Sequence, residues 1–507
     1  MDVPAPAISA RGGPEHEPPR EDASRQSAPA CREGRRRFEL IEGLRAVAVL
    51  SVLAGHAAHA WFPPGEESLR IHVVDRLLPF GVALFFCISG FVLYRPFIVR
   101  RGPAGTRVGL SSYALRRLVR IVPPYWVALT ALAVFPGLTG VFSDQWLAYY
   151  GFAQIYSSDW AAGGLGTAWT LDVEILFYAA LPLYAWAMSA RGVRAGNPGG
   201  RKRELMTLTA LAGLSLALRG LDFAYLGGDL HWLGTSLLGT FSWFALGMAV
   251  AVFSCTAAHE PLGAPARTLG SRPLVSGACA AAIFAVLVAV PGYEPGYFGP
   301  IWQVMLEFLA VGAMATLLLL IGVFGERARL ARTVLGNRVS VWLGLVSYGI
   351  YLWHAPVLTY LSKTDLVASF PVPVVAFTVS SLAVVLSLAA ASFYLLERPL
   401  LRWAGSGASR DGRLFVRRRS SRAALRRPRD RQCLRPVLPG GVTPEGGTCA
   451  PDRLQIERRS TGVQGPVSPP FAQAPEPTVQ WSRRPIRYQR VAHVAQVVQD
   501  HERRVAE

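Results

Sequence analysis

The stretch FELIEGLRAVAVLSVLAGHAAH, residues 38–59, decides the fold class of this chain. It is apolar along most of its length and long enough to cross a bilayer, which takes about 20 helical residues. It nevertheless contains Arg45 and His56. At about 1.5 Å and 100° per residue, these two residues lie roughly 16 Å apart along the helix and about 20° apart around it. Because ionisable residues inside a membrane helix are rare and usually functional, this helix face predicts a site.

Long apolar runs recur through most of the chain, and 51% of its 507 residues are hydrophobic. This composition excludes an ordinary soluble protein and predicts an all-α integral membrane protein with a bundle of about ten transmembrane helices. The third, fifth and seventh runs are short, so a count of nine to eleven spans fits the pattern. The runs are 38–62, 78–99, 118–136, 167–189, 204–221, 233–254, 274–291, 301–323, 341–361 and 372–396.

Arginines are distributed unevenly among the connections that join these runs. The connections that follow even-numbered runs are rich in arginine, whereas those that follow odd-numbered runs contain only Arg70, Arg76 and Lys363. Positively charged connections stay in the cytoplasm, so both termini are predicted to be cytoplasmic. The net charge of +19 is then explained by orientation in the lipid bilayer, and no nucleic-acid partner is predicted.

The two ends of the chain differ in composition from the apolar region between them. Residues 1–37 and 404–507 are rich in arginine and proline and lack long apolar runs, so both are predicted to be mostly disordered cytoplasmic tails. Residues 38–403 then form a single membrane domain. Six cysteines are scattered without a CxxC pair, which predicts neither a disulfide framework nor a metal site.

A pair of arginines precedes the third run. Arg117 and Arg120 are three residues apart, so they share a helix face. Pro123 and Pro124 follow them and are expected to interrupt or kink the helix, which would free backbone groups at membrane depth. Paired guanidinium groups at a cytoplasmic surface suit the bidentate capture of phosphates. The alternative is a positively charged anchor that contacts lipid headgroups.

The second run contains the small residues Ser89 and Gly90. Small residues let helices approach closely, so a packing role is predicted for both. The alternative role of Ser89 is that of a nucleophile, although no base adjoins it in the sequence.

Two carboxylates lie in the fourth run. Asp172 and Glu174 are two residues apart, about 200° around a helix, so they cannot both face one pocket. Asp172 is expected near the outer boundary, where water can solvate it. Glu174 lies deeper, on the same face as Tyr178, and it needs a partner, which we expect to be His56 or an arginine. A purely structural ion pair between two helices is the alternative.

The ninth run carries a polar stripe within an apolar helix. Ser347, Tyr351 and His354 fall on one face at helical spacing. His354 is predicted either to bind substrate or to orient another group. The alternative is a buried histidine that its own surroundings satisfy.

The predicted orientation gives each of these residues a depth in the membrane. The three arginines fall on the cytoplasmic side, whereas His56, Glu174 and His354 fall in the middle or outer half. A donor with an anionic head and a long arm fits this arrangement. Its phosphates would contact the arginines while its reactive end reaches His56.

Taken together, these residues resemble the membrane-bound acyltransferase 3 family of multi-pass O-acyltransferases. The matching motifs occur in the family's order and span about 38–403, nearly the whole membrane region. They are Gly43-Leu44-Arg45 through His56, Gly81-Val82, Phe85-Phe86, Ser89-Gly90-Phe91, Arg117 and Arg120 before Pro123-Pro124-Tyr125-Trp126, Trp169-Thr170-Leu171 with Glu174 and Phe177-Tyr178, the run from Ser347 to His354, and Glu397-Arg398-Pro399.

The resemblance implies a ten-helix membrane enzyme that moves an acyl group, commonly acetyl, from cytoplasmic acyl-CoA to a hydroxyl. Acceptors in this family include cell-surface sugars, peptidoglycan, exported polysaccharide and macrolide antibiotics. The implied location is the cytoplasmic membrane of a bacterium. The implied partners are therefore acyl-CoA and a carbohydrate or glycosylated acceptor.

The resemblance also implies roles for single residues. His56 corresponds to the catalytic histidine, and Glu174 is expected to assist it. The residues expected to bind acyl-CoA or to organise the site are Arg45, Arg117 and Arg120. The residues expected to bind the acceptor are Tyr178, Tyr351 and His354.

The resulting hypothesis is that His56 acts as general base toward an acceptor hydroxyl as that hydroxyl attacks the thioester. Glu174 would orient His56 and stabilise its imidazolium form. An acyl-enzyme route is an alternative mechanism. The alternative function is a secondary transporter that uses intramembrane Arg, His and Glu residues as a proton or substrate relay. Against it, the halves 38–189 and 204–396 show no internal repeat, which many transporters have.

Overall fold

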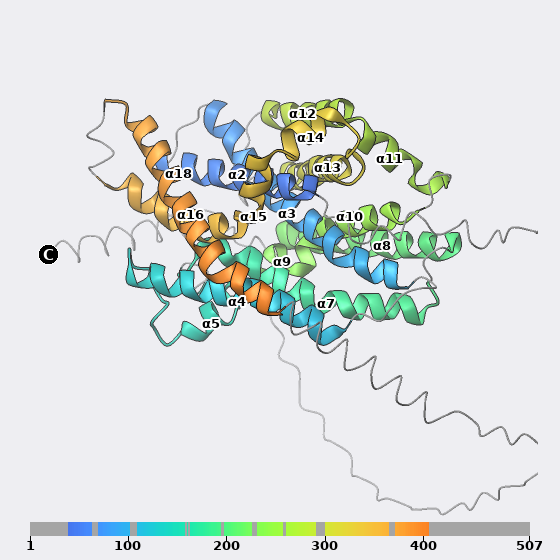
Figure 1. Ribbon diagram of the computed structural model, residues 1–507, viewed down its shortest axis with the longest axis horizontal. Helices are drawn as coiled ribbons and strands as arrows, with labels where there is room; N and C mark the ends of the chain where they lie inside the picture. The colour runs from blue at the N-terminus through green and yellow to red at the C-terminus, as the bar shows by residue number, and fades with distance from the viewer. Residues whose placement is uncertain are drawn as a thin grey trace, which may run out of the picture. The chain divides into compact units, whose positions relative to one another are not determined.

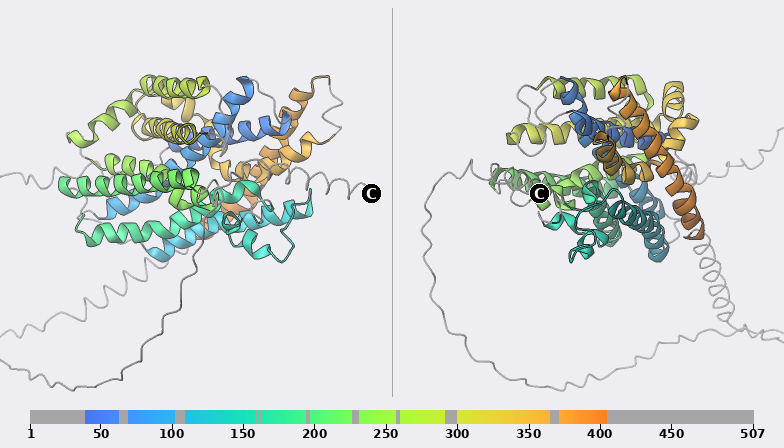
Figure 2. Two further views of the ribbon diagram at one scale, coloured as in Figure 1. Left: turned by 180° about the vertical axis from the view of Figure 1, so that it is seen from behind. Right: turned by 90° about the vertical axis from the view of Figure 1, so that its left-hand side faces the viewer.

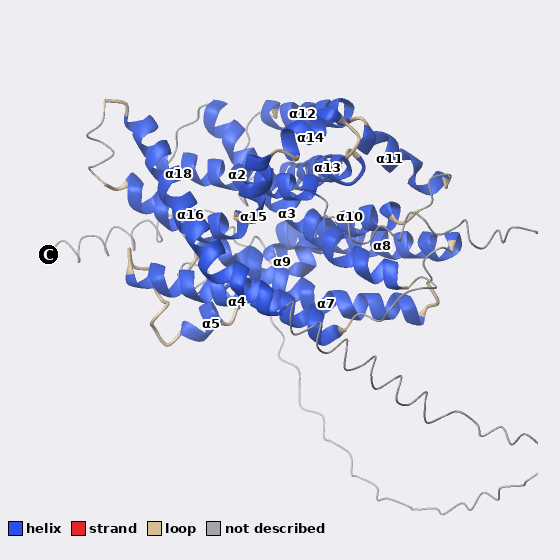
Figure 3. Ribbon diagram, viewed as in Figure 1, coloured by secondary structure: helices blue, strands red, loops and turns tan. Residues whose placement is uncertain are grey.

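The structure is a computed structural model that describes the apolar region of the chain and the short connections within it. The predicted tails 1–37 and 404–507 lie, apart from Ala404, outside the described residues. Every regular element in the described part is helical, and no strand occurs there (Figure 3). The described residues are 39–62, 69–101, 109–157, 160, 163–193, 197–225, 231–256, 260–290, 300–364 and 371–404.

Eight helices of the described region are long and apolar enough to cross a membrane. The count rises to ten if each of two sharply bent helix pairs forms one span, so the predicted all-α membrane fold is confirmed. The eight spans contain α2 (Glu39–Trp61), α3 (Leu69–Arg100), α4 (Leu110–Val134), α7 (Trp169–Ala190), α8 (Pro198–Tyr225), α10 (Leu237–Ser254), α13 (Ile301–Phe324) and α18 (Pro373–Ser392).

The two bent pairs correspond to the seventh and ninth predicted spans. In the first pair, α11 (Ala264–Ser271) meets α12 (Pro273–Ala289) at 83°. Pro273 explains this break, because proline lacks a backbone N–H and disfavours a helical conformation at the residue before it. In the second pair, α15 (Arg338–Leu345) meets α16 (Ser347–Ser362) at 70°. The shorter elements are α5 (Trp146–Tyr150), α9 (His231–Thr235), α14 (Arg329–Leu335), the 3₁₀ turns Gln154–Tyr156, Gly166–Ala168 and Pro261–Gly263, and the π-helix Phe393–Glu397.

Helix α3 runs through the helical bundle and packs against α2, α10 and α13 (Figures 1 and 2). A stack of buried aromatic rings joins α3 to α10 and α7. The ring centroids of Phe86 and Phe244 are 4.4 Å apart, and those of Phe177 and Phe244 are 4.1 Å apart. Because Phe86 precedes Ser89 by one turn and Phe177 follows Glu174 by one turn, this stack holds Ser89 and Glu174 near each other.

Two glycines allow α3 and α10 to touch backbone to backbone. A Cβ atom on Gly90 would lie 2.3 Å from the carbonyl oxygen of Phe244, and one on Gly247 would lie 1.9 Å from that of Cys87. Both distances are too short for any side chain. The predicted packing role of Gly90 is thereby confirmed.

We expect Gly247→Ala to destabilise the fold by about 1–3 kcal/mol, since a backbone oxygen must move to admit the new methyl group. Gly213→Ala is the matched control, because Gly213 also lies within a helix and its added Cβ would meet nothing within 4 Å. Thermal unfolding of the two purified variants in one detergent measures the difference. Equal unfolding midpoints would contradict the close approach of α3 and α10.

The predicted interruption of the third span is wrong. Helix α4 continues from Leu110 to Val134 through Pro123 and Pro124. One backbone carbonyl near the prolines accepts a hydrogen bond from a neighbouring helix, as is common at membrane depth. The hydroxyl of Tyr348 on α16 donates to the carbonyl oxygen of Ile121 at 2.8 Å.

Candidate active site

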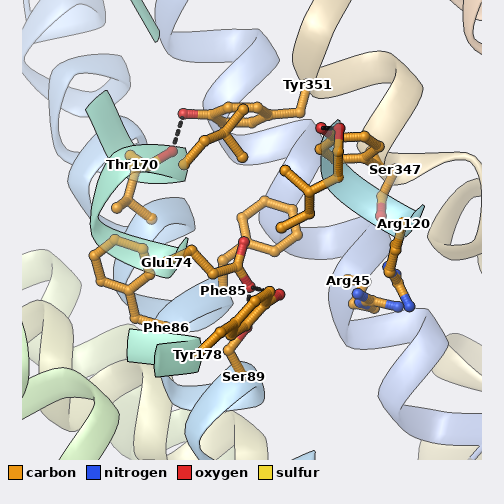
Figure 4. A pocket seen from close by; sticks show the side chains of 14 residues that line it. Arg45, Phe85, Phe86, Ser89, Arg120, Thr170, Glu174, Tyr178, Ser347 and Tyr351 are labelled. Carbon is orange, nitrogen blue, oxygen red and sulfur yellow. Dashed lines mark hydrogen bonds between the residues drawn. The ribbon is translucent and has the colours of Figure 1, made fainter. Parts of the chain in front are cut away.

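Five helices, α2, α3, α4, α7 and α16, surround a cavity inside the bundle (Figure 4). Its walls are mostly apolar and include Val82, Phe85, Phe86, Ile121 and Leu171. Polar groups converge on it from every one of these helices. They include Arg45, Ser89, Arg120, Glu174, Tyr178 and Tyr351. Five of the eight residues predicted for the site therefore line one cavity.

Glu174 accepts two hydrogen bonds at the same carboxylate oxygen. The hydroxyl groups of Ser89 and Tyr178 each donate to its Oε1 at 2.7 Å. The predicted shared face of Glu174 and Tyr178 is confirmed by this contact. The predicted partner of Glu174, His56 or an arginine, is not the hydrogen-bond partner that the structure shows. Sequence spacing also gave no sign that Ser89 would contact Glu174, because Ser89 lies on another helix.

Two of the three predicted arginines line one end of the cavity, and the third, Arg117, contacts a residue of its wall. Arg45 and Arg120 line it, and Arg45 also forms an ion pair with Glu42, its Nη1 lying 3.4 Å from Oε2. The guanidinium carbon of Arg117 lies 5.8 Å from the centroid of the Tyr178 ring, within the range of a cation–π contact. The buried Nε atoms of Arg45 and Arg117 have no hydrogen-bond partner in the described part of the chain. These two buried donors are therefore unpaired in the described region.

One acidic residue near these arginines was not predicted as part of the site. Glu397 ends the π-helix Phe393–Glu397, is only 2% exposed, and interacts electrostatically with Arg45 and Arg120. Its Oε1 has no hydrogen-bond partner among the described residues. The signal in the sequence was the Glu397-Arg398-Pro399 motif at the end of an apolar run. Single-turn π-helices are frequent at functional sites.

His56 and His354 meet although 298 positions separate them in the sequence. His354 Nε2 lies 3.3 Å from His56 Nδ1, and the two ring centroids are 4.8 Å apart at an interplanar angle of 79°. His354 is fully buried and His56 is half-buried. We call these two residues the histidine pair. Their predicted common depth is consistent with this contact.

Tyr351 separates the histidine pair from the cavity. It lines the cavity one helical turn before His354, and the two rings are 5.6 Å apart. Its hydroxyl donates to the carbonyl oxygen of Thr167 at 2.7 Å and lies 2.6 Å from the hydroxyl of Thr170. Figure 4 shows Tyr351 and Thr170 at the opposite end of the cavity from Ser89.

Glu174 forms no hydrogen bond or ion pair with His56 in the described part of the chain. It shares the cavity with Arg45, and Arg45 is roughly 16 Å from His56 along α2. The role of Glu174 in orienting His56 stays a prediction. In the structure, the side chain that contacts the His56 ring is His354.

Asp172 on α7 is buried, whereas it was predicted to be solvated. The prediction placed it where water can solvate it, but it is only 1% exposed. Its Oδ2 accepts a hydrogen bond from the backbone N–H of Ile155 at 3.4 Å, and its Oδ1 has no partner in the described region. The segment that contains Ile155 folds back over the start of α7 and excludes water. Asp172 does not line the cavity, in agreement with the predicted angular separation from Glu174.

Three kinds of side-chain group follow one another along the bundle. Guanidinium groups lie at one end of the cavity, a carboxylate with two hydroxyl donors lies beside them, and an imidazole pair lies one turn beyond Tyr351. Guanidinium groups bind phosphates, and imidazole groups transfer protons near neutral pH.

The chain is similar in sequence to several known proteins. A family model described as an acyltransferase domain matches residues 38–392. Over 331 residues the chain is 28% identical to the exopolysaccharide production protein ExoZ of Rhizobium meliloti (strain 1021), covering 64% of this chain and 89% of ExoZ. Over 385 residues it is 23% identical to the peptidoglycan O-acetyltransferase OatA of Listeria monocytogenes, covering 73% of this chain and 56% of OatA.

A third relative is the putative peptidoglycan O-acetyltransferase YrhL of Bacillus subtilis, 24% identical over 400 residues, with 75% of this chain and 57% of YrhL covered. The chain thus spans little more than half the length of OatA and YrhL. No solved structure matches it. The region matched by the family model extends from the first described helix, α2, to the end of α18. The chain therefore belongs to the acyltransferase 3 family and is a membrane acyltransferase.

Proposed function

We propose that this protein moves an acyl group, in the first instance acetyl, from acyl-CoA to a hydroxyl group of a carbohydrate at a bacterial cell membrane. The observation that carries the proposal is the placement of an arginine-lined cavity one helical turn from a pair of imidazole groups. The names of the relatives support the class of acceptor, because they concern exopolysaccharide and peptidoglycan. The proposed acceptor is accordingly a polysaccharide or one of its precursors rather than a macrolide.

The arginines are assigned to the end of the site that binds acyl-CoA, the acyl donor. Acyl-CoA carries phosphate groups at one end and the thioester at the end of a flexible arm. Arg45, Arg117 and Arg120 are proposed to bind the phosphates, since guanidinium forks match phosphate geometry. The apolar walls formed by Phe85, Phe86 and neighbouring residues suit the arm. No metal is invoked in this scheme.

The transfer step is assigned to His56. The acceptor oxygen attacks the thioester carbonyl carbon while the imidazole removes the hydroxyl proton. Collapse of the tetrahedral intermediate breaks the carbon–sulfur bond, and the imidazolium returns the proton to the departing thiolate. The products are an ester and free coenzyme A, so no other reactant is required.

Glu174 is assigned to the donor end rather than to His56. Its carboxylate holds the hydroxyl groups of Ser89 and Tyr178 and interacts electrostatically with Arg45 and Arg117. It therefore organises the wall that acyl-CoA would contact. Tyr178 supports the same wall, because Arg117 lies over its ring.

Replacing Arg120 or Arg117 with alanine is expected to weaken acyl-CoA binding about tenfold to a hundredfold. A hydrogen bond to a charged group contributes about 1.5–3 kcal/mol, and each 1.4 kcal/mol is about tenfold in affinity. The matched control is Arg116→Ala, which removes a neighbouring arginine of α4 that neither lines the cavity, as Arg120 does, nor lies over the Tyr178 ring, as Arg117 does. Calorimetric titration of acetyl-CoA into each purified variant measures the affinity. If neither the Arg117 nor the Arg120 variant differs from the Arg116 variant, the role of both arginines is to anchor α4 at the lipid surface.

Consumption of acetyl-CoA by the purified protein distinguishes the proposed acyltransferase from a transporter. In proteoliposomes supplied with acetyl-CoA and exopolysaccharide oligosaccharides, we expect release of free coenzyme A that depends on the oligosaccharide. Uptake of the oligosaccharide without acyl-CoA, and with the thioester left intact, would instead favour a transporter.

A further inference from the structure

The two rings of the histidine pair form a hydrogen-bonded unit within the helical bundle. His56 is on α2 and His354 is on α16, and their side chains meet edge to face. Each ring also contacts backbone carbonyl groups of its own helix. These carbonyl contacts determine which ring nitrogens carry protons.

A carbonyl oxygen can only accept a hydrogen bond, so a ring nitrogen that contacts one must donate. His354 Nδ1 lies 2.8 Å from the carbonyl oxygen of Tyr351 and 3.1 Å from that of Ile350. It therefore carries the proton in the neutral ring, and Nε2 is left as an acceptor. By the same reasoning His56 Nδ1, which lies 2.9 Å from the carbonyl oxygen of Val52, carries the proton of the other ring. These proton positions are assigned from the contacts.

The assignment leaves one ring nitrogen available for chemistry. The N–H of His56 Nδ1 is shared between the carbonyl oxygen of Val52 and His354 Nε2, both of which are acceptors. His56 Nε2 then holds an unprotonated lone pair and has no hydrogen-bond partner among the described residues. Both nitrogens of His354 are already engaged, and its side chain is 0% exposed, which leaves neither nitrogen for a substrate.

We propose that His354 is a positioning residue for His56 and not a residue that binds the acceptor. This inference rests on the proposed function, in which His56 is the base. His354 Nε2 accepts a hydrogen bond from the N–H of His56 Nδ1 and holds the His56 ring edge-on. This contact keeps the proton of His56 on Nδ1, so His56 Nε2 is the nitrogen that receives the hydroxyl proton.

His354 keeps its own proton throughout this cycle. The acceptor proton moves to His56 Nε2 and then to the departing thiolate, while the Nδ1 hydrogen bond to His354 persists. The role is that of the aspartate in a Ser-His-Asp triad, which orients the base and stays unprotonated. An uncharged acceptor suits this position because the surroundings are apolar and an unpaired buried carboxylate would be costly.

A packing role for His354 is the competing explanation, and two substitutions separate it from a chemical role. Phenylalanine fills the buried space with an apolar ring of similar size but offers no acceptor. Glutamine places a polar amide near the position of Nε2, where its oxygen accepts a hydrogen bond, but it is a poorer apolar filler. A packing role therefore ranks His354→Phe above His354→Gln in activity, and a positioning role ranks them in the opposite order.

The experiment measures transfer from [14C]acetyl-CoA to exopolysaccharide oligosaccharides by the purified full-length protein and both variants. We expect His354→Phe to lower kcat about tenfold to a hundredfold, by analogy with the range found for groups that orient metal-ligating histidines. The KM for acetyl-CoA and the thermal unfolding midpoint should stay at the wild-type values. His354→Gln should recover most of the lost kcat.

Two results would overturn the inference while leaving the proposed function intact. One is a His354→Phe variant with wild-type kcat, and the other is a folded His354→Gln variant that is slower than His354→Phe. A wild-type protein that binds acetyl-CoA but transfers no acyl group to any carbohydrate would overturn the proposed function, and the role of His354 with it.

Discussion

His56→Ala is expected to lower the rate of acyl transfer about 10²–10⁴-fold, the contribution that a positioned general base makes to catalysis. The ring of His56 is the only one of the histidine pair with a nitrogen left for substrate, because both nitrogens of His354 are engaged. The variant should still bind acetyl-CoA, since Arg45 and Arg120, which we assign to the donor, line the cavity and His56 does not. Initial rates and calorimetric affinity for acetyl-CoA measure the two effects separately.

His59→Ala is the matched control for this variant. His59 lies one turn further along α2, is exposed, and its Nδ1 makes the same contact with the carbonyl oxygen four residues earlier, at 2.9 Å from Gly55. It belongs to neither the cavity nor the histidine pair. We expect it to keep wild-type transfer. Near wild-type transfer by a folded His56→Ala variant would remove His56 from the mechanism.

Glu174→Ala is expected to lower kcat/KM for acetyl-CoA about a hundredfold. The substitution removes the acceptor of the Ser89 and Tyr178 hydroxyl groups and a negative charge that interacts with Arg45. Leaving buried donors unpaired costs about 1–3 kcal/mol, and about 1.4 kcal/mol is a factor of ten. Glu174→Gln keeps an acceptor oxygen and loses only the charge, so its effect should be smaller.

The kinetic constant that changes in Glu174→Ala tests where the residue acts. A role at the donor end predicts that KM for acetyl-CoA rises, because the cavity wall and its arginines are disturbed. A role beside His56, as the sequence had suggested, predicts that kcat falls with KM unchanged. Steady-state kinetics at varied acetyl-CoA and saturating oligosaccharide distinguish the two. The second outcome would contradict the role that we propose for Glu174 at the donor end.

Much of the site could be predicted because helical spacing determines which residues of one helix share a face. The contact of Glu174 with Tyr178, four residues on, follows from this rule. So does the polar stripe that contains Tyr351 and His354. The positive charge of Arg45 in an apolar segment predicted that α2 contributes to the site, and Arg45 lines the cavity.

Contacts between helices were the part that could not be predicted from spacing. Ser89 meets Glu174 because a stack of aromatic rings sets the rotation and depth of α7 against α3. His56 meets His354 because the pair α15 and α16 bends by 70° and presents α16 to α2. Neither the depth of one helix against another nor a bend between two helices is encoded in a single apolar run. The exposure of Asp172 was predicted wrongly for the same reason, because the segment that contains Ile155 lies outside α7 and covers it.

The central claim is that the protein forms an ester between an acyl group of acyl-CoA and a carbohydrate hydroxyl. The most direct test incubates the purified protein with [13C]acetyl-CoA and exopolysaccharide oligosaccharides and examines the oligosaccharides by mass spectrometry before and after mild alkali. We expect labelled acetyl groups on the oligosaccharide that alkali removes, and we expect them to be lost in His56→Ala but kept in His59→Ala. Oligosaccharides that stay unlabelled while acetyl-CoA remains intact would contradict the claim.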